Sequence, residues 1–246
     1  MFRYLVVSSF LIVVNLFATI NIAVATNVSY AMESLKKEFK KENPNIKLNI
    51  ILGSSGKLTA QIEHNAPYDI FLSANMFYPN LLYKTKKALT KPKVYAKGSL
   101  VYFCKNKNNF DKNLEDLLLS KNIKKIVLAN PKIAPYGKAA LETLQNIKLY
   151  SKIKNKLIYA QSASQTLSYA ITVADVGFVS KSAFFSSKMR KYKENIHYKH
   201  IRSNLYTPIS QGIVLLSDSS EAKKFYQFIL SNKAKKIFKQ YGYNIE

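Results

Sequence analysis

Short apolar segments alternate with amphipathic segments along the first third of the chain. Apolar runs of strand length predict strands over residues 20–25, 46–52 and 69–73. Between them, apolar residues at helical spacing predict helices over 28–41 and 57–65. This alternation predicts a mostly parallel sheet with helices on both faces, because parallel neighbours need helical crossovers.

The rest of the chain repeats the alternation and predicts a second unit of the same kind. The further predicted strands are 100–104, 126–129, 157–160, 176–179 and 213–216, and the further helices are 138–149, one from Ser164, 220–230 and 233–240. Two α/β units in tandem predict two lobes, joined by crossing strands near 98–103 and 206–212. Lobe I then comprises 19–98 with 206–246, and lobe II comprises 99–205.

The amino terminus favours an exported protein. Residues 5–17 are apolar apart from two serines and an asparagine, follow the cation Arg3, and have the length of a signal-peptide core. We therefore expect a signal peptide over 1–18, cleavage near Ala18 and a soluble protein in the periplasm. The alternative is a buried first strand. A lipid anchor is excluded, because no cysteine lies near the cleavage site.

Composition narrows the chemistry. The 246 residues are 48% hydrophobic, enough for sizeable cores, and 38 Lys+Arg against 14 Asp+Glu give a formal charge of +24. Such a charge favours anionic partners, so a nucleic-acid or envelope-polymer binder is one alternative. Lys pairs such as Lys36-Lys37 are more simply interpreted as solvated surface. The single Cys104 excludes disulfides and multi-thiolate metal sites, and we interpret His197 and His200 as solvated rather than metal-binding.

Small, hydroxyl-rich sequences stand at four predicted strand-to-helix junctions. They are Ala25-Thr26-Asn27, Gly53-Ser54-Ser55-Gly56, Ala134-Pro135-Tyr136-Gly137 and Gln161-Ser162-Ala163-Ser164. Any one of them could be an ordinary helix cap. Four helix starts at the edge where open α/β sheets bind ligands would instead offer free backbone N–H groups and dipoles to an anion.

The motifs carry a resemblance to a known family. Residues 23–27, 53–58 with Gln61-Ile62, 66–74, 134–140 and 238–245 resemble the periplasmic molybdate-binding proteins of bacterial ABC transporters, in order along the whole mature chain. The family implies the type II periplasmic binding-protein fold, two α/β lobes that hold a tetrahedral oxyanion between them. It also implies capture of molybdate or tungstate and delivery to a membrane permease. From the donor-only residues of the four junctions, we expect a monomer that binds one dianion without catalytic residues, cofactor or metal cation.

The resemblance also implies the ligand set. Matched residue by residue, the donors are Thr26 and Asn27 in the first loop, Ser55 in the second, Tyr136 in the third and the backbone at Ala163 in the fourth. The chain follows the Thr-Asn and Tyr variant of the family pocket. It departs from the variant that has Ser in the first loop and a Tyr near the position of Ser180.

The residue types favour a fully deprotonated anion. Hydroxyl and amide groups donate hydrogen bonds to an oxyanion, whereas phosphate at neutral pH carries a proton and needs an acceptor. Asp69 is the nearest acidic residue, and we interpret it as structural, at a strand start. A binding protein of the same fold for another anion, such as sulfate or a small carboxylate, is the main alternative.

Two enzyme classes fit the sequence poorly. The Gly53–Lys57 segment superficially resembles a nucleotide-binding phosphate loop, but Ile51 stands where that motif needs Gly and Leu58 where it needs Ser or Thr. A Ser-His-Asp hydrolase would need a G-x-S-x-G elbow, which the sequence lacks. We therefore expect a binding protein rather than an enzyme.

Overall fold

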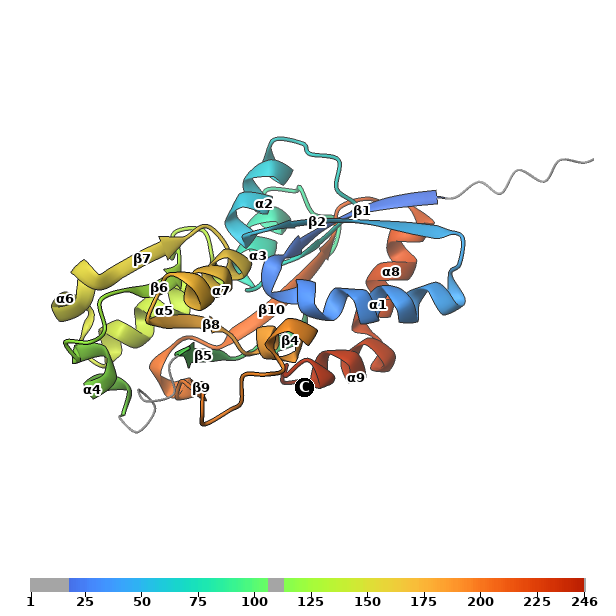
Figure 1. Ribbon diagram of the computed structural model, residues 1–246. Coiled ribbons are helices and arrows are strands. Elements are labelled where there is room, and N and C mark those ends of the chain that lie inside the picture. The colour runs from blue at the N-terminus through green and yellow to red at the C-terminus, as the bar shows by residue number, and fades with distance from the viewer. Residues whose placement is uncertain (1–17, 106–112, 246) are drawn as a thin grey trace, which may run out of the picture.

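Two five-stranded sheets form the centre of the molecule (Figure 1). The computed structural model describes residues 18–105 and 113–245, so the predicted signal peptide lies outside the described residues apart from Ala18, which begins β1. The first sheet has the order β2 (Ile46–Gly53), β1 (Ala18–Ala25), β3 (Ile70–Leu72), β10 (Ile209–Leu215), β4 (Lys93–Gly98). The second has the order β7 (Leu157–Ala160), β6 (Ile126–Ala129), β8 (Val176–Ser180), β5 (Leu100–Phe103), β9 (Tyr198–His200).

The two sheets share one topology. In each, the first strand of a parallel set lies between the second and the third, as β1 lies between β2 and β3 and β6 lies between β7 and β8. An antiparallel strand then pairs with the third and with an edge strand, β10 in the first sheet and β5 in the second. The predicted two-lobed α/β fold is confirmed, and both sheets are mixed because β5 and β10 run against the parallel set.

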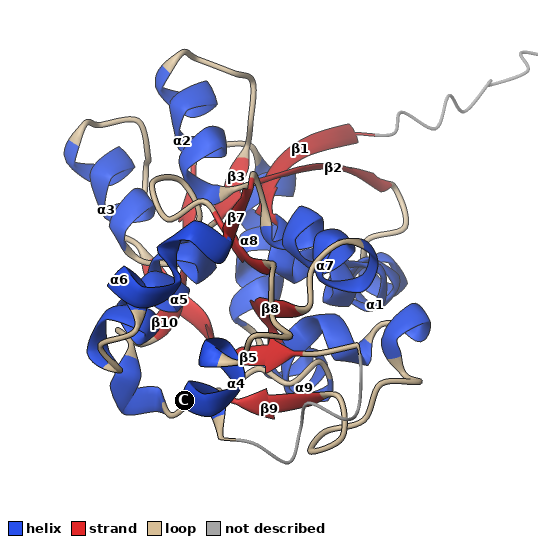
Figure 2. Ribbon diagram, turned by 60° about the vertical axis from the view of Figure 1, so that its left-hand side comes forward, coloured by secondary structure: helices blue, strands red, loops and turns tan. Residues whose placement is uncertain are grey.

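Helices cover both faces of each sheet (Figure 2). Around the first sheet lie α1 (Ser29–Glu42), α2 (Ser55–Glu63), α3 (Phe77–Lys84), α8 (Ser220–Leu230) and α9 (Asn232–Gln240), and around the second lie α4 (Leu114–Leu119), α5 (Pro135–Asn146), α6 (Tyr150–Ile153) and α7 (Ala163–Thr172). Short 3-10 turns add η1 (Thr26–Val28), η3 (Lys154–Lys156), η4 (Lys181–Phe185), η5 (Ser187–Met189) and η6 (Ser203–Leu205). In the described ranges, no helix is both long and apolar enough to cross a membrane.

Side-chain alternation along the strands builds a core on each face. In β1, Ile22 and Val24 pack with α1, α8 and α9, whereas Ala23 between them packs with α2 and α3. In β6, Leu128 and Val127 likewise face opposite cores. Period-two alternation therefore buries both faces, as expected for a sheet covered by helices on both sides.

The chain passes between the sheets twice. It leaves the first sheet after β4 and enters β5 across Ser99, and it returns over residues 201–208 between β9 and β10. We call the part around the first sheet lobe I and the part around the second lobe II. The strand membership supports the lobe boundaries predicted from the sequence, which stay a prediction. Near the carboxyl end, Asn244 exchanges backbone hydrogen bonds of 2.8 and 2.9 Å with Lys97, beside the first crossing.

Candidate functional site

A small cavity lies where the four predicted junctions meet, two from each lobe. Its wall is formed by Ala25, Thr26, Asn27, Gly53, Ser54, Ser55, Ala74, Ala134, Pro135, Tyr136 and Ala163. The structure thus brings together Thr26, Asn27, Ser55, Tyr136 and Ala163, all five residues proposed from the sequence. Their contact with a ligand stays a prediction.

Ser55 is the first residue of α2, and its hydroxyl oxygen already accepts one hydrogen bond. Its Oγ accepts a hydrogen bond of 2.9 Å from the backbone N–H of Ala74, at the end of β3. The helix cap is the preceding residue, Ser54, so the simple capping interpretation of Ser55 is wrong. Because the Ala74 N–H occupies a lone pair on Oγ, the Ser55 hydroxyl hydrogen is left to point at another acceptor.

The Asn27 side chain belongs to a buried polar network. Its Nδ2 donates to Gln211 Oε1 at 2.9 Å and to the Tyr243 hydroxyl at 3.1 Å. Tyr243 in turn donates to the Asn27 carbonyl at 2.8 Å, as does Ser182 at 3.0 Å. Both amide hydrogens of Asn27 are used, so any donor that Asn27 offers to an anion is its backbone N–H.

Tyr136 lies in the first turn of α5 and is 3% exposed. Burial raises the pKa of its phenol well above the ordinary value, so the group stays protonated and keeps its O–H donor. Gln211 Nε2 lies 3.5 Å from the Tyr136 oxygen, and the Gln211 amide is oriented by the O–H of Tyr95, which donates to its Oε1 at 2.9 Å. Gln211 therefore approaches Tyr136 as a donor, which leaves the phenol hydrogen to point elsewhere.

The fourth junction contributes backbone rather than side chains. Ser162 caps α7 and accepts a 3.2 Å bond from the N–H of Gln165, and Ser164 interacts with Tyr30 of α1. The Ser180 hydroxyl lies 3.2 Å from that of Ser182. None of Ser162, Ser164 and Ser180 is among the residues that line the cavity, so Ala163 is the residue of this junction that does.

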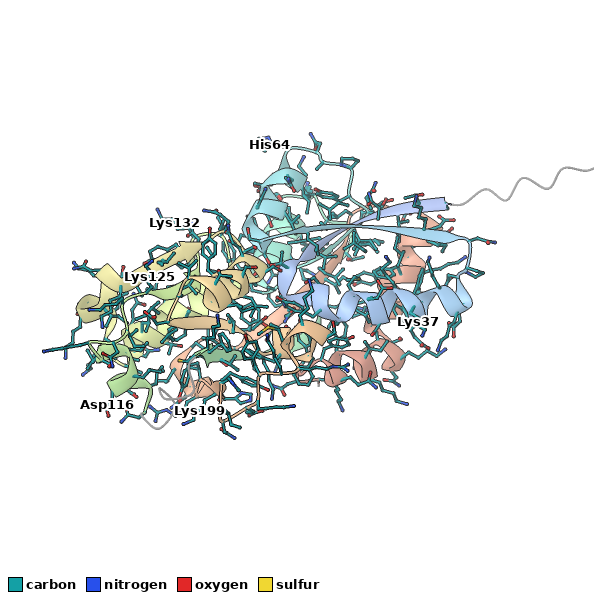
Figure 3. The ribbon with its side chains drawn as sticks, viewed as in Figure 1. Lys37, His64, Asp116, Lys125, Lys132 and Lys199 are labelled. Atoms are coloured by element: carbon teal, nitrogen blue, oxygen red, sulfur yellow. The ribbon has the colours of Figure 1, made fainter. Side chains whose placement is uncertain are left out.

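The cavity wall is neutral. No charged side chain is among the described residues that line it, and the labelled Lys37, Lys125, Lys132 and Lys199 lie at the periphery of the molecule (Figure 3). Within residues 18–105 and 113–245, no three His, Cys, Asp or Glu side chains come together as a metal site requires. Any electrostatic attraction for an anion would therefore come from helix starts and polar hydrogens.

The site and its support include two residues that were not predicted from the sequence. Ala74 lines the cavity one residue beyond the predicted strand 69–73, a position that the sheet-edge rule could have found. Gln211 is fully buried within β10, and a lone glutamine inside an apolar strand is a usable signal. Asp69 has the predicted structural role, because its Oδ2 accepts from the Asn21 N–H at 2.7 Å.

The histidines lie outside the site, and one prediction about them is wrong. His64 stands at the end of α2 on the outside of the molecule (Figure 3). His197 is buried rather than solvated, because its Nδ1 accepts from the Lys193 N–H at 3.0 Å and its ring packs edge-on against Tyr192. His200 pairs with Glu194 at 3.0 Å.

The lobes contact each other beside the cavity. The Gly56 N–H of lobe I donates to the Ile133 carbonyl of lobe II at 2.9 Å, and the Tyr78 hydroxyl donates to the Lys132 carbonyl at 3.3 Å. The cavity has room for about one water molecule. A larger ligand would therefore need the lobes to separate before it enters.

We expect Gly56→Ala to impair closure without unfolding lobe I. An added Cβ would lie 3.0 Å from the Ile133 backbone and 2.7 Å from the Tyr78 hydroxyl, whereas Ala suits a helix better than Gly. The measurements are anion affinity, which should fall, and the melting temperature without ligand, which should not. Exposed Ala60→Gly in the same helix is the control, expected to lower the melting temperature alone. Unchanged affinity in Gly56→Ala would contradict the importance of this contact.

Two similar lobes, two crossing segments and a small uncharged cavity between the lobes define a ligand-binding protein of the two-lobed class. A family model described as "Bacterial extracellular solute-binding protein" matches residues 20–244, and the chain belongs to this family. The chain is 30% identical to the molybdate-binding protein ModA of Azotobacter vinelandii, over 93% of this chain and 91% of that protein. It is 33% identical to ModA of Rhodobacter capsulatus, over 79% of this chain and 76% of that protein.

A solved structure agrees with the sequence relatives. The periplasmic molybdate-binding protein of Azotobacter vinelandii matches with a TM-score of 0.84 and 29% identity, over 92% of this chain and 99% of that one. The family resemblance predicted from the sequence motifs is confirmed.

Proposed function

We propose that this protein captures molybdate or tungstate in the cavity between its lobes and delivers it to the membrane permease of an ABC transporter. The carrying observation is a cavity wall of neutral donors at four converging junctions, with no charged side chain among its described residues. The similarity to molybdate-binding relatives supports this choice of anion. In this proposal the protein acts in the periplasm as a monomer, after export through an N-terminal signal peptide, and uses no catalytic residue, cofactor or metal cation.

The donor pattern explains the choice of anion charge. The Ser55 oxygen already accepts from the Ala74 N–H, and the Asn27 carbonyl already accepts from Tyr243 and Ser182. These two acceptors are occupied, and no carboxylate is among the described residues that line the cavity. A protonated oxyanion such as hydrogen phosphate would therefore bury its proton without the strong acceptor that a carboxylate provides, which is costly.

Calorimetric titration with molybdate, tungstate, sulfate and phosphate tests the proposal. We expect one molybdate or tungstate per chain, weaker sulfate binding and no phosphate binding. A chelator should leave binding unchanged. Added salt should also have little effect, since neutral donors in a closed cavity are screened far less than surface lysines. Preference for sulfate or a small carboxylate would overturn the proposed ligand and favour another anion carrier, while steeply salt-dependent binding would favour a polymer on the basic surface.

A further inference from the structure

Ser54 carries an unpaired hydroxyl inside the cavity wall. The residue is 5% exposed, and its Oγ is one of two buried side-chain oxygens without a hydrogen-bond partner among the described residues. The other is Tyr226 Oη, in the lobe I core against α1 and α9. Ser54 alone of these two lines the interlobe cavity.

The position of Ser54 makes this lack of a partner unusual. It is the N-cap of α2, where a serine oxygen normally accepts a backbone N–H from the first helical turn. Such a bond is present at other helix starts of this protein: Asn113 of α4, Ser162 of α7, Ser219 of α8 and Ser231 of α9 each accept an N–H from three residues further on. The Ser54 hydroxyl makes no such bond.

The neighbouring N–H groups explain how the start of α2 is otherwise satisfied. The Gly56 N–H donates across the lobe interface to Ile133, and the Leu58 N–H donates to the Ser54 carbonyl. The hydroxyl oxygen of Ser54 is therefore not the group that holds this helix end in place. A buried hydroxyl without any partner is costly to a folded protein, so a partner supplied by a ligand would remove that cost.

We infer that the Ser54 hydroxyl donates directly to the bound oxyanion, in addition to the groups at Thr26, Asn27, Ser55, Tyr136 and Ala163. This inference rests on the proposed function and extends it. Ser54 and Ser55 then present two adjacent hydroxyls from the start of one helix. The anion would gain two side-chain donors from a single junction of lobe I, where the sequence motif suggested one.

Two matched serine substitutions test the inference. Ser54→Ala removes an unpaired hydroxyl, so the melting temperature without ligand should stay the same or rise, while molybdate affinity should fall about ten- to a hundredfold. Ser219→Ala removes a hydroxyl of the same helix position, at the start of α8 and outside the cavity wall, that already accepts from the Ala222 N–H. It should lower the melting temperature and leave molybdate affinity within about threefold of wild type.

The remaining outcomes each decide the question. Wild-type molybdate affinity in a folded Ser54→Ala protein would overturn the inference and leave the proposed function intact. Failure of the wild-type protein to bind molybdate or tungstate would refute the proposed function itself. If Ser54→Ala does not fold, Ser54 is structural and the inference is wrong, unless Ser54→Gly, which keeps a good cap residue, folds and shows the affinity loss.

Discussion

Ser55→Asp should abolish anion binding in a protein that stays folded. The Ala74 N–H that now donates to the Ser55 oxygen would donate to the new carboxylate, and the start of α2 favours a negative charge. For the ligand the effect is opposite. Two like unit charges about 4 Å apart repel by about 4 kcal/mol at an effective dielectric constant of 20, so a dianion loses about 8 kcal/mol. Molybdate titration should then detect no binding, while the thermal melt stays cooperative.

Ser55→Ala gives the graded form of the same result. Losing one charge-assisted donor should weaken affinity about ten- to a hundred-and-fiftyfold. The variant also leaves the Ala74 N–H without its acceptor, which should cost about 1 to 3 kcal/mol of folding free energy. Thr59→Ala is the control, because that buried hydroxyl bonds the Ser55 carbonyl within the helix and does not line the cavity. Wild-type affinity in folded Ser55→Asp would remove this loop from the site.

Gly137→Ala should cause the largest loss of stability. An ideal Cβ at this position would lie 2.0 Å from the Ala129 carbonyl oxygen and 2.6 Å from its carbon, both backbone atoms at the end of β6. The first turn of α5 therefore packs on β6 only because Gly137 has no side chain. We expect a loss above about 3 kcal/mol, beyond the usual range for overpacking, because backbone must move.

The same substitution should weaken anion binding, since Tyr136 precedes Gly137 in the turn that would shift. Denaturant unfolding and molybdate titration measure the two effects. Lys138→Ala is the matched control: this side chain is exposed and its 3.9 Å ion pair with Glu142 is worth about 0.3 to 0.5 kcal/mol. Near wild-type stability in Gly137→Ala would show that α5 can move away from β6 at little cost.

Local patterns were sufficient to predict most of the regular structure. The strands 126–129 and 157–160 and the helix 220–230 are observed with the predicted bounds, because each is a strongly apolar or clearly periodic segment. Helix α5 begins at Pro135 rather than at 138, since proline suits the first turn. The pattern missed α4, α6 and β9. It also missed α3, where Pro79 interrupts the helical signal, and β4, an edge strand with lysines among its apolar residues.

Five residues that line the cavity were predicted from the sequence, but the hydrogen-bond network behind them was not. Each junction is a local motif, so the sequence could indicate that five residues meet between the strand ends of the two sheets. The network behind them is not local: Asn27 bonds Gln211 and Tyr243, which are 184 and 216 residues away along the chain. Nothing near Asn27 reveals that its amide is already occupied. The buried state of His197 was missed for a different reason: its contacts with Tyr192 and Lys193 are local, but they lie in an irregular segment without a helix or strand pattern.

The place of β10 in the first sheet sets an order for folding. β10 lies between β3 and β4, yet it is separated from them by the whole of lobe II. Lobe I therefore has an open interior edge on β3 until residues 209–215 have been synthesised, whereas every strand of lobe II comes from one continuous segment, 100–200. Long-range pairing of this kind is slow, because a large loop must close before it yields contacts. The backbone amides of lobe II should thus become protected from hydrogen exchange first. The amino-terminal third of the chain should complete its fold only after the carboxyl-terminal third has been synthesised.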